Sequence, residues 1–400
     1  MRSFKYRDYR FLWSGTVLHS AALWMQRVAV SWLVWELTHS ALFVALSFSL
    51  PQVSFVLLGP FVGAVADKIN RKFLIIGAQV MMCVGNAGLA VLVYTGSETT
   101  WLVILIAMGL GVAMSTYFLS VQAMVFDIVD RKDAMNGLSL WFVGMRAISA
   151  VGAIAGGFII DWVGIWPAFM TASIVYVLAA GTMMLIRHRP KPRTGPTVSV
   201  LSDLKDGLRH ILGSRELAAL LVLTTIAEAF GWGTPSLLAI FASDRVFDVG
   251  PRGLGFLNAA FAIGGMVGAA GLAAVGDFRR KGAALAVALV MTAVALAAFS
   301  QVPWFALAMV LLIALGAVLA VYDTVNTVLI QGNVGEEMRG RALGAIQIAI
   351  GLGPVGPLLM GFAAGFVGVQ TAVGMGAAIV LVGAMAVSMA APGVRRMESG

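Results

Sequence analysis

The sequence predicts an all-α membrane protein in which twelve transmembrane helices form two six-helix bundles. The 400-residue chain is 60% hydrophobic and only 12% charged, with a mean hydropathy of +0.93. A soluble domain is typically about 45–50% apolar and about 25% charged, so a water-exposed globule cannot bury this much apolar surface. The apolar residues gather in long runs, and one long polar segment divides these runs into two sets of six.

The predicted spans follow from the lengths of the apolar runs. A helix that crosses about 30 Å of hydrocarbon needs about 20 predominantly apolar residues. In the first half the runs that meet this length are 11–36, 42–66, 73–95, 101–126, 137–160 and 165–186. In the second half they are 216–242, 253–275, 282–300, 304–330, 341–366 and 369–391.

The segment between the two sets is polar and divides the chain into domains. Its first part is basic and rich in proline, which predicts an extended linker. Its second part spaces Leu201, Leu204, Leu208 and Ile211 by three or four residues, which is typical of an amphipathic helix. Such a helix would lie on the membrane surface or pack as a solvated helix against the bundle ends. The predicted boundaries are 1–186 for the first bundle, 187–215 for the cytoplasmic linker and 216–400 for the second bundle.

The positions of basic residues predict the orientation. Cytoplasmic loops of membrane proteins carry an excess of Lys and Arg. If both termini are cytoplasmic, only Arg245 and Arg252 fall in outer loops, Arg27 and Arg146 lie within spans, and all other Lys and Arg are cytoplasmic. The net charge of +8 is therefore a topology signal and not a nucleic-acid-binding face. The basic N-terminus precedes an apolar run too long for a signal peptide, so it is read as a retained first helix.

Composition argues against a metal centre and an enzyme. The single cysteine, Cys83, and four scattered histidines offer no set of metal ligands. No clustered catalytic groups are visible, and no cofactor is expected. The glycine pairs Gly59–Gly63, Gly264–Gly268 and Gly361–Gly365 are interpreted as helix-packing faces within one chain, which favours a functional monomer.

The two halves resemble each other in sequence. "GAVADKINRK" follows the second span and "AAVGDFRRKG" follows the eighth, so that Asp67 and Asp277 are each followed four residues later by a basic residue. "DIVDRKDAMNG" after the fourth span likewise corresponds to "NVGEEMRGRALG" after the tenth. Two related six-span repeats are the plan of many secondary transporters.

These motifs resemble the major facilitator superfamily. The family's signature after the second helix is Gly-x-x-x-Asp-(Arg/Lys)-x-Gly-(Arg/Lys)-(Arg/Lys). The residues that match it are Gly63, Asp67, Lys68, Arg71 and Lys72, while Asn70 stands where glycine is usual. The stretch "WMQRVAVSWLVWELTHSALFVALSFSLPQ" and the later "EEMRGRALG" are similar to the branch with the enterobactin exporter and the macrolide efflux proteins. The resemblance covers nearly the whole chain and implies the major facilitator fold.

The resemblance implies an inner gate at this signature. Asp67 would cap the positive N-terminal end of span 11, which would hold the two halves together on the cytoplasmic side. Arg71 and Lys72 are expected to pair with cytoplasmic carboxylates such as Asp127 or Asp130. The alternative is that these charges only fix the topology.

Three charged residues within the spans are the candidate coupling groups. Arg27 lies just past the middle of span 1, Glu228 near the middle of span 7, and Asp323 in the inner half of span 10. A charge at the bilayer centre costs at least about 2.5–3.5 kcal/mol, so it should face a partner or a wet cavity. The resemblance implies that spans 1, 4, 7 and 10 line the cavity. Glu228 or Asp323 would then exchange a proton, with Arg27 as counter-charge; the alternative is a structural salt bridge.

Aromatic and glycine residues complete the expected pathway. Trp24 and Trp232 lie near the proposed cavity, and Gln122 is the strongly polar candidate of span 4, where many proton-linked relatives carry an Arg. The stretch "EAFGWGTPS" predicts a bend or break beside Glu228. This bend would act as a gate or reflect ordinary lipid packing.

Span 5 carries the remaining charged candidate, Arg146, which is interpreted as part of an ion pair at the rim and not as a substrate contact. Relatives place a Gly-Pro-x-x-Gly-Gly element typical of antiporters after such an Arg. Here Ala153 replaces the proline, although Gly152, Gly156 and Gly157 still allow tight packing.

Together these patterns predict an exporter in the cell inner membrane. Its substrate would be a small amphipathic or aromatic compound of the drug or siderophore class. Transport would proceed by alternating access with proton antiport, and membrane lipid would surround the protein. The alternatives are an uptake symporter or lipid flippase of the same fold, or a non-transporting membrane sensor.

Overall fold

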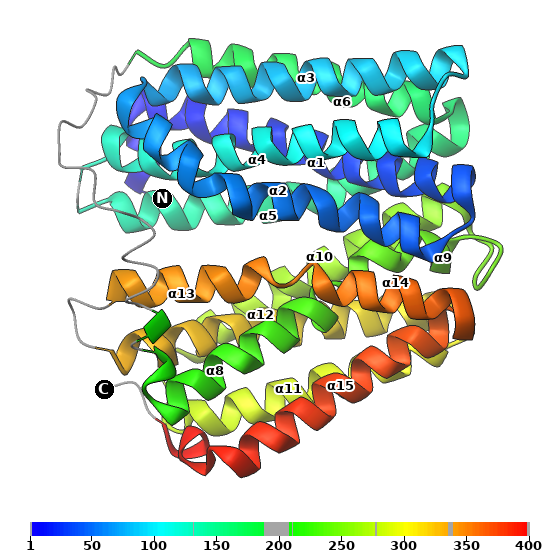
Figure 1. Cartoon of the computed structure of the whole chain (residues 1–400). Coiled ribbons are helices and arrows are strands. Elements are labelled where there is room, and N and C mark those ends of the chain that lie inside the picture. The colour runs from blue at the N-terminus through cyan, green and yellow to red at the C-terminus, as the bar shows by residue number, and fades with distance from the viewer. Residues whose placement is uncertain are drawn as a thin grey trace. The chain divides into compact units, whose positions relative to one another are not determined.

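All regular structure in the described part of the chain is helical (Figure 1). The computed structural model describes residues 2–130, 132–187, 208–209, 211–276, 278–334 and 339–397. Within these ranges the side chains of 55–68, 339–341, 343 and 396 are not described. The predicted amphipathic helix at 201–211 falls almost entirely outside the described residues.

The first six predicted spans are each occupied by one helix. After a short 3₁₀ turn, η1 (Arg2–Lys5), the helices begin and end within a few residues of the predicted limits. They are α1 (Arg7–Thr38), α2 (Ala41–Lys68), α3 (Arg71–Thr95), α4 (Thr100–Ile128), α5 (Ala134–Val163) and α6 (Ile165–Met184).

The last six predicted spans are also helical, but two are interrupted. The seventh contains α8 (Arg215–Ile226), η2 (Ala227–Gly231), η3 (Thr234–Leu237) and α9 (Leu238–Ala242). The eighth to tenth are α10 (Gly250–Val275), α11 (Lys281–Gln301) and α12 (Phe305–Gly332). The eleventh is split into α13 (Arg339–Gly351) and α14 (Val355–Val367), and α15 (Val369–Ala390) is the twelfth, followed by η5 (Pro392–Arg396).

Ten of the described helical segments are long and apolar enough to cross a membrane. The chain is therefore a multi-pass membrane protein. The first two predicted spans are not among the ten. For α2 the described side chains end at Ser54, and they give a shorter apolar helix, Ala41–Ser54. The count of twelve membrane crossings stays a prediction.

The chain divides into two compact units, which are described separately. The first contains Met1–His39, Leu46–Thr197 and Asp248–Ala259, and the second contains Ser40–Ala45, Val198–Phe247 and Ala260–Gly400. The predicted domain limits remain a prediction, because each unit also takes a short segment from the other half of the chain.

In the first unit α1 packs between α5 and α6. Gly152 of α5 meets the backbone of Ala21, and Gly156 meets that of Met25, so small residues let the two backbones approach closely. One end of this unit is filled by buried aromatic side chains. Trp141 Nε1 and Tyr117 Oη each donate a hydrogen bond of 3.1 Å to Thr16 Oγ1.

In the second unit α11 packs against α12 and α15. Gly264 and Gly268 of α10 face the backbones of Ile313 and Ala317 of α12, and a Cβ on either glycine would collide with the carbonyl of its partner. The interpretation of this glycine pair as a packing face within one chain is confirmed.

The predicted break in the seventh span is confirmed. The helix widens to a π-turn at Ala227–Gly231 and then tightens to a 3₁₀ turn at Thr234–Leu237, because Pro235 lacks the N–H that a continuous helix requires. Gly233 packs on Pro357, and Gly356 packs on the backbone of Ala229, so the break meets the start of α14.

The eleventh span is not the continuous helix that its apolar run predicts. α13 ends at Gly351 and α14 begins at Val355, with a turn at Leu352–Pro354 between them. Pro354 cannot donate a helical hydrogen bond, and Gly353 donates to the Ile350 carbonyl at 2.9 Å in a tighter turn. The residues Gly344–Val367 still form one apolar segment long enough to cross a membrane.

Candidate functional site

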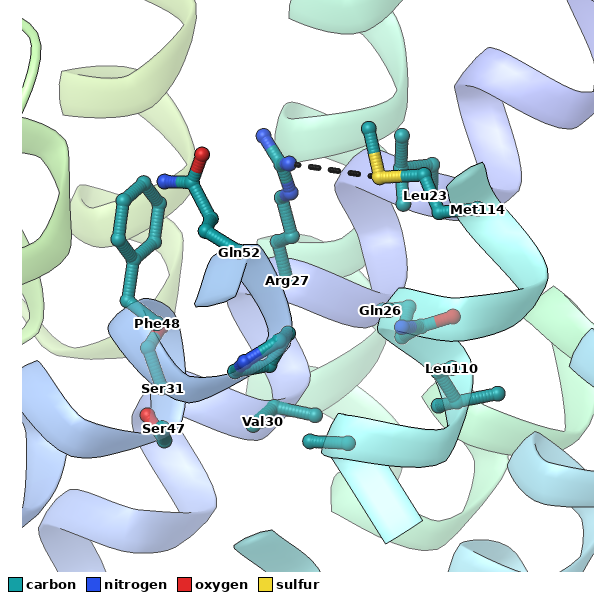
Figure 2. A pocket seen from close by; sticks show the side chains of 13 residues that line it. Leu23, Gln26, Arg27, Val30, Ser31, Ser47, Phe48, Gln52, Leu110 and Met114 are labelled. Carbon is teal, nitrogen blue, oxygen red and sulfur yellow. Dashed lines mark hydrogen bonds between the residues drawn. The ribbon is translucent and has the colours of Figure 1, made fainter. Parts of the chain in front are cut away.

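The first unit contains a cavity of about 130 Å³ between α1, α2 and α4 (Figure 2). Its lining is mostly apolar, with a small set of polar side chains directed to the same space. This composition is typical of a small-molecule site. The lining residues are Leu23, Gln26, Arg27, Val30, Ser31, Ser47, Phe48, Pro51, Gln52, Ala107, Leu110, Gly111 and Met114.

A close approach of α2 and α4 shapes this cavity. Gly111 of α4 faces the backbone of Pro51 in α2, and a Cβ at this glycine would collide with the Pro51 carbonyl. Only a residue without a side chain lets the two helices meet here. Proline inside α2 removes one helical N–H, which is tolerated in a membrane helix when neighbouring groups pack against the break.

Arg27 is the one cation among the residues that line the cavity. Its Nη2 atom donates to the sulfur of Met114 at 3.8 Å, and a thioether is only a weak acceptor. Its guanidinium carbon lies 5.1 Å from the centre of the Trp24 ring and 5.6 Å from that of Phe48. Among the described residues, no carboxylate lies within 4.0 Å of its nitrogen atoms.

Two glutamine amides share the cavity with Arg27. Gln26 is 6% exposed, and its carbonyl accepts hydrogen bonds from Asn86 Nδ2 at 2.8 Å and from Tyr176 Oη at 3.2 Å. These two bonds fix the direction of the amide and leave its NH₂ group without a partner among the described residues. Gln52 lies beside Arg27 in Figure 2. The site therefore offers the donors of Arg27 and of the Gln26 NH₂ group beside the Gln52 amide, which can donate or accept.

The two predicted carboxylates lie in the second unit, on adjacent elements. Glu228 belongs to the π-turn η2, and a Cβ on Gly353 would lie 3.5 Å from its Cβ. Asp323 lies on α12, next to the buried Tyr322. Four residues after Glu228, the Trp232 ring meets Phe261 edge-on, with ring centres 5.2 Å apart. The backbone break thus holds Glu228 and Trp232 on the irregular part of the seventh span.

At the start of α3, Arg71 pairs with Asp127 of α4 at 2.5 Å, and Asp127 is one of the two expected partners. The expectation for Lys72 is wrong, because its Nζ donates to the carbonyls of Met184 at 2.9 Å and Ile186 at 2.6 Å. These groups lie at the C-terminal end of α6, where unpaired carbonyls attract a cation.

Of the other expected gate residues, Gly63, Asp67 and Lys68 lie where side chains are not described, and Asp277 lies outside the described residues. Arg146 is exposed on α5. Gln122 is half-buried on α4, two turns beyond Met114, and does not line the cavity. The roles proposed for these residues stay predictions.

A polar clamp holds the N-terminus against the start of α5. Lys5 Nζ lies 2.6 Å from Asp133 Oδ2, and Tyr6 Oη donates to the same oxygen at 2.9 Å. The hydrogen bond from Lys5 holds the pKa of Asp133 below its usual value, and the same bond raises the pKa of Lys5. The clamp fixes the N-terminal end of α1 against the N-terminal end of α5. Both ends are predicted to face the cytoplasm.

The fold and the cavity define a class of protein, a helical multi-pass membrane protein with a mostly apolar pocket that contains a few polar side chains inside one bundle. Solved structures agree on the fold. A bacterial homologue of the human lysosomal transporter Spinster aligns with a TM-score of 0.77 at 13% identity, over 98% of this chain and 99% of its own. The nucleoside transporter NupG also aligns with a TM-score of 0.77 at 13% identity, over 96% and 99%.

The chain belongs to the family described as a transmembrane secretion effector, within the major facilitator superfamily, which matches residues 2–399. Macrolide efflux protein A of Streptococcus pyogenes is 20% identical over 92% of each chain. The multidrug efflux pump Tap of Mycolicibacterium fortuitum is 25% identical over 93% of this chain and 92% of its own. The enterobactin exporter EntS of Shigella flexneri is 25% identical over 84% and 80%. These relatives are transporters rather than enzymes.

Proposed function

We propose that this chain is a secondary active exporter for a small amphipathic or aromatic compound, driven by exchange with protons. The observation that carries the proposal is the cavity between α1, α2 and α4, into which a cation without a carboxylate partner among the described residues projects. The named relatives that span most of the chain are exporters or efflux proteins, which supports the direction.

Alternating access follows from the two-repeat plan. Twelve spans in two halves would rock about a central site, so that the substrate faces one side of the membrane at a time. Asp67 in the first half and Asp277 in the second would close the cytoplasmic side by capping helix N-termini of the opposite half. The pair of Arg71 and Asp127 supports this role, because it fixes the start of α3 against α4 next to the signature.

Proton coupling is assigned to Glu228 and Asp323. A carboxylate within the membrane is costly when charged, so proton binding and conformational change are linked. Glu228 lies in η2, directly before the break between η2 and η3. A small change in the backbone at this break would therefore move the Glu228 carboxylate. Arg27 would act as the counter-charge from the first half, as the sequence predicts.

The protein is placed in the cell inner membrane, with both termini in the cytoplasm and with a monomer as the functional unit. The charge distribution of the loops supports this orientation. The glycine pair of α10, which is used for packing inside the chain, supports the monomer.

Everted membrane vesicles test the proposal. The cytoplasmic face of such vesicles is outside, so an exporter accumulates a radiolabelled aromatic compound inside them when the lumen is acidified. Vesicles without the protein, and vesicles treated with a protonophore, are the controls. Accumulation that appears only in right-side-out vesicles would identify uptake and contradict export. Redistribution of a labelled phospholipid without movement of aromatic compounds would identify a flippase.

A further inference from the structure

The polar groups of the cavity in the first unit favour one class of ligand, which the proposed function does not specify. Its one charged lining group, the guanidinium of Arg27, is a donor, and the Gln26 amide also presents its NH₂ group because its carbonyl is taken by Asn86 and Tyr176. Arginine stays charged at all physiological pH values. A guanidinium among apolar walls is stabilised by an anion, and Arg27 has none within ion-pair distance among the described residues.

We propose that this cavity is the subsite for an aryl acid, the anionic aromatic end of the exported compound. The proposal rests on the proposed function and narrows its substrate class. The carboxylate would accept two parallel hydrogen bonds from the planar guanidinium of Arg27, the geometry in which Arg binds carboxylates best. The aromatic ring would lie against Phe48, which faces the same space as Arg27 and Gln52 (Figure 2).

The size of the cavity agrees with one ring. Its volume is about 130 Å³, and an apolar cavity of about 150 Å³ is known to accept benzene. A complete drug-sized molecule needs a pocket of about 300–1,000 Å³. The cavity therefore holds one end of the substrate, and the rest of the compound would extend beyond it.

The present partner of Arg27 is easily replaced. The sulfur of Met114 is a weak acceptor at 3.8 Å, so a carboxylate would displace it with a net gain in hydrogen bonding. Met114 is unbranched and flexible, and its side chain can move aside without a change in the backbone. The Gln26 amide, which is fixed by Asn86 and Tyr176, would donate to a carboxylate oxygen or to a hydroxyl on the ring. An organic cation in the same place would be repelled by Arg27.

Photolabelling of the full-length protein in nanodiscs tests the proposal with a matched pair of probes. 4-Azidobenzoate carries the acid, and 4-azidobenzamide has nearly the same shape without the charge. We expect the acid to label peptides from α1, α2 or α4 at a concentration at least about tenfold lower than the amide, because charge-assisted hydrogen bonds favour it. Unlabelled benzoate should compete, whereas benzamide and sodium chloride at the same concentration should not.

Variants separate charge from shape. Arg27→Gln should remove the preference for the acid, Arg27→Lys should keep part of it, and Arg245→Gln, a change in an exposed arginine of the outer loop, should leave it intact. Phe48→Leu should weaken labelling by both probes equally. If Arg27→Gln does not fold, the test rests on two measurements: the ratio of acid to amide labelling in the wild type and the same ratio in Arg27→Lys.

Equal labelling by acid and amide in the wild type would overturn the proposal. A preference that survives Arg27→Gln, labels confined to other helices, or competition by chloride as strong as by benzoate would overturn it too. Binding is measured without a gradient. Acid labelling without accumulation in everted vesicles would therefore refute export and leave the subsite standing.

Discussion

The contact between Gly111 and Pro51 gives the sharpest test of how the cavity is built. A Cβ at Gly111 would lie 2.8 Å from both the Cα and the carbonyl carbon of Pro51, and closer still to its oxygen. These are backbone atoms, so no side-chain rotation relieves the overlap. Gly111→Ala should therefore push α2 away from α4, and overpacking of this kind typically costs about 1–3 kcal/mol.

A matched control is available on the same helix. At Gly109 the nearest atom to an added Cβ is Met81 Cε at 3.7 Å, which is an ordinary contact. Gly109→Ala should therefore be neutral or gain about 0.5–1 kcal/mol from the higher helix propensity of alanine. Because Gly111→Ala gains the same propensity, the difference between the two variants isolates the overlap with Pro51.

The assay is thermal unfolding of the purified protein, followed by intrinsic tryptophan fluorescence. For a unit of about 200 residues, 1 kcal/mol shifts the midpoint by about 2–4 °C in soluble proteins, so Gly111→Ala should unfold several degrees below Gly109→Ala. It should also weaken labelling by 4-azidobenzoate, because Pro51 and Gly111 both line the cavity. Equal midpoints for the two variants would refute the packing of α2 on α4 described here.

Two further predictions concern charge. Glu228→Gln or Asp323→Asn should abolish the pH dependence of efflux in everted vesicles at unchanged expression, and wild-type pH dependence in both variants would rule out the proton role. The contact between Lys5 and Asp133 should persist at neutral pH. Because the pKa of Asp133 is lowered in the folded state, the contact should be lost only as the pH falls through that lowered value, below the unfolded value of about 3.9. Hydrogen exchange of residues 2–6 measures this release, and Asp133→Asn should remove the acid transition.

The sequence was most informative where a structural property depends on the chain alone. The length of an apolar run determines whether a helix can cross the hydrocarbon, and each predicted span is helical in the structure. Proline lacks a donor wherever it stands, so the break at Thr234–Leu237 follows from Pro235 and its neighbouring glycines. The same reasoning applied to Gly353 and Pro354 would have predicted the break between α13 and α14.

Partners contributed by other helices were harder to predict. Lys72 was expected to meet a carboxylate, but it binds carbonyls at the end of α6. These carbonyls are unpaired because a helix ends there, and the sequence does not show which helix end lies beside α3. The pairing of Arg71 was predicted correctly because its partner Asp127 is itself charged and lies near the end of α4, the helix that follows α3 in the chain.

The contacts of Arg27 include both kinds, one that the sequence of a single helix predicts and others that depend on neighbouring helices. Trp24 precedes Arg27 by three residues on one helix, so helical geometry alone places the two side chains on one face, and the cation–π contact follows. The other neighbours of Arg27 come from α2 and α4: Phe48, Gln52 and Met114. Their approach to Arg27 depends on which positions of the three helices lie at the same depth. Gly111 sets that alignment through a contact that needs no polar or charged residue. A search for charged residues in the spans therefore finds the cation and misses the cavity that gives it a function.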